Sequence, residues 1–401
     1  IADVSFYVQD GDPLDQEAKK RGNSFYFPDR VIPMLPEEIS NNLCSLNPHE
    51  AKKCIIIEAQ LYSGQLKSFK IHRGIIKSVG RLTYNQVDDV MFSKKIKSKY
   101  FKIIKDLFIT YEFLKEKSQV RGKLNFERKE FEIKEDKKKI IFEKKKKLES
   151  YNLIEEFMIL ANSIIGKILK KNNVKSIYRN HEQPTNEKIL NLKKIINEFD
   201  IKYRGSFRTQ IDIKHLQEIF KKKKVLYLND FLLKSQSKAY YENKNKGHFG
   251  LSLQEYTHFT SPIRRYSDLI VHRDLIKLYF KGLKIKKSPN ISSHLNLQEK
   301  KADSIERKIL DRACSLYLKK FKKYEFRGFI DSIESFGIFI SAIDYPFSGL
   351  ARIRNDRIQN IKRFPNNKKF KIGQLVKFRI KRNNVYNGKI LLDKVRVLTD
   401  E

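Results

Sequence analysis

The amino-acid sequence predicts an α+β protein, in which a domain of mixed strands and long helices is followed by a small all-β barrel. Hydrophobic residues make up 40% of the 401 residues, which is enough to build folded cores. Apolar residues recur at helical spacing over several stretches before residue 322. After Tyr324 the spacing changes to two, with glycines at the turns. We therefore place two domains at 1–322 and 323–401.

The charge of the chain indicates a polyanionic partner. Lys and Arg number 84 against 47 Asp and Glu, a formal net charge of +37. Such an excess favours nucleic acid or an anionic membrane surface over a neutral metabolite. Part of it has a simpler source, because Lys, Ile and Asn are overused as in AT-rich genomes. The 12% of aromatic residues are more informative, since single-stranded bases stack on aromatic rings.

Several protein classes are disfavoured by what the sequence lacks. No apolar run approaches the ~20 residues of a membrane-spanning helix, and we find no signal peptide. Cys44, Cys54 and Cys314 lie far apart, which supports neither a disulfide framework nor a zinc site. We expect a cytoplasmic protein with no membrane contact.

The first 90 residues are predicted to be rich in strands. The segment 1–8 alternates like a strand that faces a core, so we expect the chain to begin within a strand and to be an N-terminally truncated fragment. In the next strand, Phe25 and Phe27 would face the core and Tyr26 the opposite side. Pro36 opens a short helix, because proline and two acids suit a first helical turn.

The middle of the chain changes from paired strands to helices. Residues 54–62 and 69–82 are predicted to pair, and the capping box at 83–86 starts the next helix. Residues 94–150 hold a long basic helix and then Lys-rich strands, before a clear amphipathic helix at 151–171. Further helices are predicted at about 186–199, 212–236, 262–281 and 295–321.

The segment from Phe259 to Tyr266 carries the strongest local signal. Ser261 as N-cap and Pro262 at the first helical position predict a helix start. Arg264 and Arg265 would then lie in the first turn, where the helix dipole disfavours cations. Such a site can hold a phosphate, because amide N–H groups and guanidinium groups converge on it. The alternative is that both arginines pair with acids such as Asp268 or Glu255.

Other candidate residues are less distinctive. Glu306 lies beside the apolar stripe of the last long helix, where a carboxylate is often an ordinary surface residue. The histidines lack metal-ligand spacing, and no HExxH, GxSxG, Walker or GxGxxG motif occurs. In the barrel, some rings must form the core, whereas others beside arginines suit an oligonucleotide-binding face. These rings are Phe326, Phe329, Phe336 and Phe339, and the arginines are Arg327, Arg352 and Arg354.

Together these segments resemble the ribonuclease II / ribonuclease R family of processive 3′-to-5′ exoribonucleases. The resemblance covers nearly the whole chain. It rests on IADVSFYV (1–8), GNSFYFPDRVIPMLPEEISNNLCSLNP (22–48), EEFMILAN (155–162), IYRNHEQP (177–184) and HFGLSLQEYTHFTSPIRRYSDLIVHR (248–273). The residues YFPDRVIPMLPEEIS resemble the ribonuclease R branch of the family more closely than the ribonuclease II branch. GFIDSIESFGIFI (328–340) and SGLARI (348–353) look like an S1 RNA-binding barrel.

The resemblance implies a channel that admits single-stranded RNA and releases nucleoside 5′-monophosphates. Tyr26 would orient the 3′-terminal nucleotide, Arg264 would stabilise charge at the scissile phosphate, and Glu306 would be a supporting carboxylate. Arg265, Phe336 and Phe339 would contact RNA. The ribose 2′-hydroxyl would distinguish RNA from DNA. We expect a monomer.

The family depends on Mg²⁺, and this sequence departs from the family's pattern at the residues that bind the ion. Its magnesium-binding aspartates precede the IADV segment, so we expect the metal ligands upstream of Ile1 and none in this chain. Two-metal hydrolysis needs clustered carboxylates, and Asp88 with Asp89 does not replace them. The family therefore implies a parent exoribonuclease of which this chain alone is inactive.

Two further functions are left open. The chain can be an RNA-binding protein that lost catalysis but retains the channel and the barrel. A basic membrane-surface protein is disfavoured, because the apolar helix faces suit a globular core.

Overall fold

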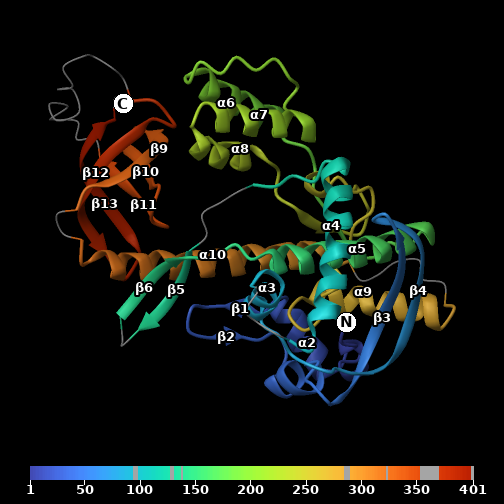
Figure 1. Ribbon diagram of the computed structural model, residues 1–401. Coiled ribbons are helices and arrows are strands. Elements are labelled where there is room, and N and C mark those ends of the chain that lie inside the picture. The colour runs from blue at the N-terminus through green and yellow to red at the C-terminus, as the bar shows by residue number, and fades with distance from the viewer. Residues whose placement is uncertain are drawn as a thin grey trace.

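The computed structural model describes residues 1–93, 98–126, 131–136, 139–283, 290–321, 324–352 and 370–398. They form the α+β protein that the sequence predicts, with helices and small sheets first and a barrel last (Figure 1). No helix in these ranges has the length and apolar character needed to span a membrane. Arg354 lies outside the described residues.

The N-terminal part surrounds a long hairpin. Strands β3 and β4 pair antiparallel over their length, as predicted, and pack on the largest hydrophobic core through residues such as Ile55 and Ile71. The elements here are α1 (Val4–Tyr7), α2 (Pro13–Arg21), β1 (Phe25–Tyr26), β2 (Val31–Ile32), a π-helical turn (Glu38–Leu43), β3 (Ala51–Tyr62) and β4 (Gln65–Lys77).

The prediction of a strand over 1–8 is wrong in its second half. Only Ala2 forms a bridge, to Cys54, and the chain then turns into α1. Val4 and Val8 are both fully buried. Their spacing of four residues places them on one side of a helical turn, which buries both side chains in the core.

The middle of the chain is mainly helical. The predicted capping box forms at Thr83 and Gln86. The bounds are α3 (Tyr84–Phe92), α4 (Phe101–Arg121), β5 (Phe131–Asp136), β6 (Lys139–Lys144), α5 (Glu149–Lys171), β7 (Tyr178–Asn180), α6 (Asn186–Asn197), α7 (Gln210–Lys222), a 3₁₀ turn (Leu226–Leu228), α8 (Asn229–Ser235), β8 (Tyr240–Glu242), a 3₁₀ turn (Phe249–Leu251), α9 (Tyr266–Leu275), a π-helical turn (Ile276–Phe280) and α10 (Ser292–Leu318).

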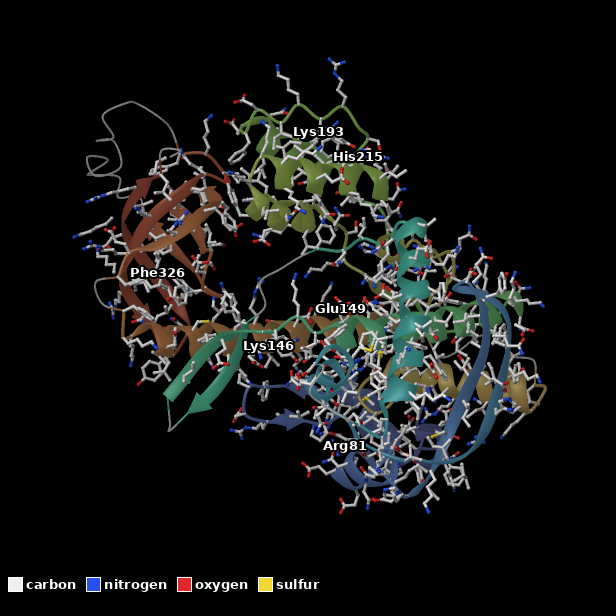
Figure 2. The ribbon with its side chains drawn as sticks, viewed as in Figure 1. Arg81, Lys146, Glu149, Lys193, His215 and Phe326 are labelled. Carbon is white, nitrogen blue, oxygen red and sulfur yellow. The ribbon has the colours of Figure 1, made fainter. Side chains whose placement is uncertain are left out.

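The C-terminal strands close into a five-stranded barrel in the order β10-β11-β13-β12-β9. The strands are β9 (Phe326–Glu334), β10 (Gly337–Ala342), β11 (Ser348–Arg352), β12 (Leu375–Asn384) and β13 (Lys389–Val397). β11 and β13 pair in parallel and the other neighbours antiparallel. Phe326 lies in the barrel core (Figure 2).

The barrel is joined to the rest of the protein on two sides. Cys314 and Leu318 of α10 belong to the barrel core. Phe329 instead packs outward into the core of the α6–α8 unit, where its ring stacks on Tyr227 at 5.6 Å. Helix α10 therefore runs from the barrel across to the N-terminal part (Figure 1).

Candidate functional site

Three segments that are distant in sequence meet beside β1. The Ser24 N–H donates to the Arg264 carbonyl at 3.0 Å, and the Tyr266 N–H donates to the Gly22 carbonyl at 2.9 Å. Asn23 and Arg265 form a bridge between these two bonds. The segment that leads into β1 is thus paired antiparallel with the segment that leads into α9.

Helix α10 supplies the third segment. The Tyr26 N–H donates to Glu306 Oε1 at 3.0 Å, across 280 residues of sequence. The Cβ atom of Gln298, two turns earlier on the same helix, lies 2.7 Å from the position that a Cβ at Gly22 would take. The predicted residues Tyr26, Arg264 and Glu306 are therefore brought to one place by backbone pairing and one helix.

The side chains of these three residues are accessible. The Tyr26 residue is 45% exposed, whereas Phe25 and Phe27 are half-buried, as the alternation predicts. Arg264 is exposed, and its guanidinium forms no hydrogen bond or ion pair with any described residue. Glu306 is half-buried, and its second carboxylate oxygen accepts no hydrogen bond from a described residue. A ring, a cation and a carboxylate are thus available to a ligand.

The predicted helix start at Ser261 is wrong, because α9 begins at Tyr266. Residues 261–265 form a turn instead, in which the N–H groups of Arg264 and Arg265 donate to the Ser261 carbonyl at 3.2 and 3.0 Å. The reason is tertiary, because the Arg264 carbonyl and the Tyr266 N–H, which a helix from Ser261 would use internally, pair instead with Ser24 and Gly22. Asp268 also accepts the Ser261 N–H at 2.7 Å.

Arg265 differs from its neighbour in being partnered. Its Nε and Nη2 donate to the two oxygens of the Asp268 carboxylate, at 2.9 and 2.7 Å. Burial disfavours the charged guanidinium, but Asp268 raises the pKa of Arg265 above its usual value. The alternative prediction, pairing with Asp268, is therefore confirmed for Arg265, while the contact of Arg265 with RNA stays a prediction.

A buried aromatic and histidine cluster lies behind this ion pair. The Tyr241 hydroxyl and His258 Nδ1 are 2.9 Å apart. Burial, followed by the charges of Arg265 and Arg179, lowers the pKa of His258 well below its usual value. Arg179 is held by Glu299 of α10 at 2.7 Å. The lowered pKa favours the neutral form of His258 within this cluster.

Comparison with known proteins decides the family. The sequence model of the RNB domain matches residues 1–281. This chain belongs to the RNB domain family. This chain is 31% identical to ribonuclease R of Escherichia coli over 423 aligned residues. The alignment covers 97% of this chain and 52% of the relative. The chain thus spans about half the length of the curated relatives that it matches.

Solved structures give the same result for the RNB fold. Ribonuclease R of Mycoplasma genitalium, in complex with ribose-methylated single-stranded RNA, matches with a TM-score of 0.89 and 29% identity. The match covers 98% of this chain and 65% of that protein. The same enzyme in complex with double-stranded RNA matches with a TM-score of 0.84 and 28% identity, over 98% and 69% of the two chains.

The barrel of the RNB chain divides its phenylalanines between core and surface. Phe326 and Phe329 are buried, whereas Phe336 is 54% exposed and Phe339 is half-buried. The rings of Phe336 and Phe339 meet edge to face, with centroids 6.1 Å apart. Arg327 and Arg352 are exposed on the strands that flank β10. Exposed rings and exposed arginines thus both occur around β10, and their contact with RNA stays a prediction.

A magnesium site does not fit the described part of the RNB chain. Within the described ranges, no group of three His, Cys, Asp or Glu residues could hold a metal ion. Asp88 has another role, because its two oxygens accept the N–H groups of Glu149 and Ser150, each at 2.9 Å. This carboxylate thus caps the start of α5.

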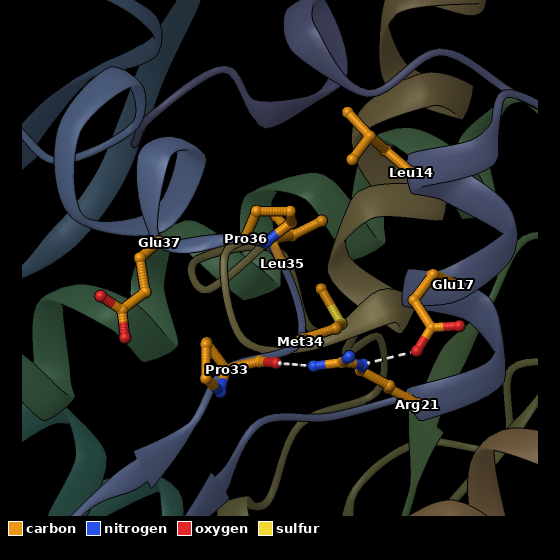
Figure 3. A pocket seen from close by; sticks show the side chains of 8 residues that line it. All are labelled: Leu14, Glu17, Arg21, Pro33, Met34, Leu35, Pro36 and Glu37. Carbon is orange, nitrogen blue, oxygen red and sulfur yellow. Dashed lines mark hydrogen bonds and ion pairs between the residues drawn. The ribbon is translucent and has the colours of Figure 1, made fainter.

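The structure also contains two surface hollows whose residues the sequence did not mark as a site. One, of about 1,060 Å³, is lined by loops 181–186 and 245–255, where the rings of His181 and His248 are 5.0 Å apart. The other, of about 240 Å³, lies between α2 and the segment 33–37 (Figure 3). Its Arg21 donates to the Pro33 carbonyl and to the Glu17 carboxylate, so this guanidinium is already engaged within the protein. Their loops come together only in the fold, so no local sequence signal marks them.

Proposed function

We propose that this RNB-family chain serves the 3′-to-5′ exoribonucleolytic hydrolysis of RNA to nucleoside 5′-monophosphates. The substrate is single-stranded RNA, and structured RNA as well. One observation carries the proposal: an exposed ring, a free guanidinium and a carboxylate meet at Tyr26, Arg264 and Glu306. The relatives are ribonuclease R enzymes, two of them solved with RNA.

Each residue has a role that follows from its chemistry. Tyr26 stacks on the 3′-terminal base, because every base offers a π face to a ring. Arg264 binds the scissile phosphate and stabilises the charge that develops on it. One Glu306 oxygen fixes the Tyr26 backbone, and the other accepts a hydrogen bond from a ribose hydroxyl.

Magnesium is the proposed cofactor of the reaction. Bound by clustered carboxylates, such an ion would supply charge that activates the attacking water and stabilises the leaving oxygen. The described residues do not provide such a ligand set. The roles of Tyr26, Arg264 and Glu306 therefore concern binding, orientation and charge, which do not require the metal to be placed.

The barrel is the second RNA-binding element of the proposal. We assign residues 1–322 to an RNB-type domain and 323–401 to an S1-type domain. Phe336 and Phe339 stack on bases upstream of the 3′ end, while Arg327 and Arg352 neutralise phosphates. The protein acts as a monomer in the cytoplasm. The cysteines Cys44, Cys54 and Cys314, all buried and free, suit a reducing compartment.

The experiment is to incubate the chain with 5′-labelled single-stranded RNA and Mg²⁺ and to resolve the products by length. A ladder that collapses to a short end product supports hydrolysis by this chain. Intact RNA that is nonetheless bound indicates an RNA-binding chain whose hydrolytic chemistry needs metal ligands that the described residues do not supply. Absence of both hydrolysis and binding contradicts the proposal.

A further inference from the structure

The carboxylate of Asp268 has an unusual number of partners for a fully buried group. Asp268 is 0% exposed, and its two oxygens accept from the Ser261 N–H, from Arg265 Nε and Nη2, and from the Ser267 hydroxyl, at 2.7 to 2.9 Å. Three of these donors belong to the 261–265 turn. The carboxylate therefore ties both ends of this turn to the first turn of α9.

The backbone of Arg264 is fixed by this arrangement while its side chain stays free. Its N–H donates to Ser261 and its carbonyl accepts from Ser24. Both peptide groups that flank the Arg264 Cα are thus held, one by the turn and one by the segment before β1. These bonds set the direction in which the side chain leaves the backbone, and the guanidinium itself forms no hydrogen bond or ion pair with a described residue.

Stability alone does not account for a buried ion pair at this position. Taking an arginine and an aspartate out of water costs free energy that their attraction often fails to repay. Asp268 is not the N-cap of α9, because that residue is Arg265 and no side chain caps the helix. What the carboxylate provides is a hold on the planar fork of Arg265 and on the Ser261 N–H at the same time.

We propose that Asp268 and Arg265 are positioning residues, which together fix the direction of Arg264 toward an RNA phosphate. The inference rests on the proposed function, in which Arg264 binds phosphate. In this role Arg265 acts through the turn, because Asp268 engages its Nε and Nη2. Asp268 is a conformational requirement for binding a polyanion, although its own charge repels one.

The sign of this effect separates positioning from simple electrostatics. Removing a negative charge near a phosphate site strengthens RNA binding if only charge matters. Positioning predicts the reverse. We expect Asp268→Asn to weaken the binding of a short single-stranded RNA about as much as Arg264→Ala does, roughly tenfold for one charge-assisted contact. Both changes are expected to reduce the salt slope by about one phosphate contact.

A double-mutant cycle on the full 401-residue chain is the test. Dissociation constants for a fluorescein-labelled single-stranded RNA are measured by anisotropy for the wild type, Arg264→Ala, Asp268→Asn and the double variant. Because Asp268 acts through Arg264, the double variant should bind no more weakly than Arg264→Ala alone. Losses that add, or an Asp268→Asn variant that binds as tightly as the wild type, would overturn the inference.

Two further variants keep the result interpretable. Asp15→Asn removes another buried carboxylate, which pairs with Arg273 and Tyr266 of the same helix but not with the turn. It should lower the unfolding temperature and leave RNA affinity unchanged. Arg265→Lys keeps the positive charge but loses the planar guanidinium fork, so it should weaken RNA binding as Asp268→Asn does. It therefore still tests the inference if Asp268→Asn fails to fold. Wild-type affinity in Arg265→Lys would also overturn the inference.

Failure of the proposed function gives a different result. If Arg264→Ala binds RNA as tightly as the wild type, then Arg264 does not hold phosphate and the proposed function loses its site. If Arg264→Ala binds more weakly but the cycle is additive, only the positioning role of Asp268 is lost.

Discussion

Arg264 and Arg265 are neighbours in sequence with opposite environments. The guanidinium of Arg265 is enclosed by Asp268 and by the buried cluster around Tyr241. That of Arg264 is exposed and unpaired among the described residues. Because the guanidinium of Arg264 has no partner in the described protein to give up, it is suited to a charge that appears during reaction.

Arg264→Ala should therefore reduce turnover far more than RNA affinity in a form of the protein that hydrolyses RNA. We expect about 10²- to 10³-fold in kcat, as for loss of one donor to a transition-state charge. Single-turnover rates and dissociation constants are measured on the same RNA. Equal losses in both quantities would show that Arg264 is only a binding contact.

Gly22 permits the close approach of α10 to the site. Its φ of +73° and the Gln298 Cβ, 2.7 Å from a hypothetical Cβ, both oppose a side chain. Gly11 is a matched control, since it has a φ of +86° and open space around it. We expect Gly11→Ala to lower the free energy of unfolding by on the order of 1 kcal/mol, through its φ alone.

Gly22→Ala should cost at least about 1 kcal/mol more, because α10 must also shift. It should weaken RNA binding as well, since that shift moves Glu306 away from Tyr26. Chemical denaturation and anisotropy measure the two effects. Equal costs for the two glycines would contradict the role of the close approach.

At the scale of elements, α10 is the part that connects the site to the barrel. In its first half, Asn296 exchanges two hydrogen bonds with the Tyr241 backbone, and Glu306 follows at the middle. Near its end, the Ser315 carbonyl accepts from Asn383 of β12 at 2.6 Å. A helix of 27 residues is about 40 Å long, so one rigid element spaces the Tyr26 site from the barrel.

The barrel offers a paired prediction on two phenylalanines. Phe336→Ala should weaken RNA binding roughly tenfold, the effect of one lost base stack, with little change in stability. Phe326→Ala should instead cost about 3–5 kcal/mol of unfolding free energy, because its ring is 1% exposed in the barrel core. Unchanged RNA affinity in Phe336→Ala would mean that this face does not stack on bases.

The same elements show what the sequence can and cannot predict. The capping box at Thr83 and the alternation around Tyr26 depend on neighbours within a few residues, and both were predictable. The barrel was also predictable, because the two-residue alternation of its strands is a local pattern. The start of α9 was not, because Asp268 takes the Ser261 N–H and 22–24 takes the backbone of 264–266. Sequence also could not show that Glu306 reaches Tyr26, a contact made only by the fold.

For the whole molecule, buried neutral histidines make stability depend on pH. Burial, followed by the nearby His181, lowers the pKa of His248 to about 3. Burial similarly lowers the pKa of His272 to about 4. At pH values above roughly 6.5, the pKa of a histidine in the unfolded chain, these histidines are neutral in the folded and the unfolded protein, and their protonation does not affect stability. Below that pH the unfolded chain binds protons that the folded chain refuses, so stability falls as the pH drops from about 6.5 toward the folded values.

His248→Gln should flatten this loss, and each titrating histidine accounts for up to about 1.4 kcal/mol per pH unit. The control is His72→Gln, because His72 is exposed. Free energies of unfolding at pH 7.5, 6 and 5 measure the difference. A pH profile that is the same in both variants would contradict the assignment of acid lability to His248.

The central claim is that Tyr26, Arg264 and Glu306 form a site for the 3′ end of RNA. The most direct measurement compares the affinity of the chain for a linear single-stranded RNA with that for the same sequence closed into a circle. We expect tighter binding of the linear form, and loss of this difference in Tyr26→Ala, because only a free end can reach the ring. Equal affinity of the wild type for the linear and the circular RNA would show that these three residues do not bind a 3′ end.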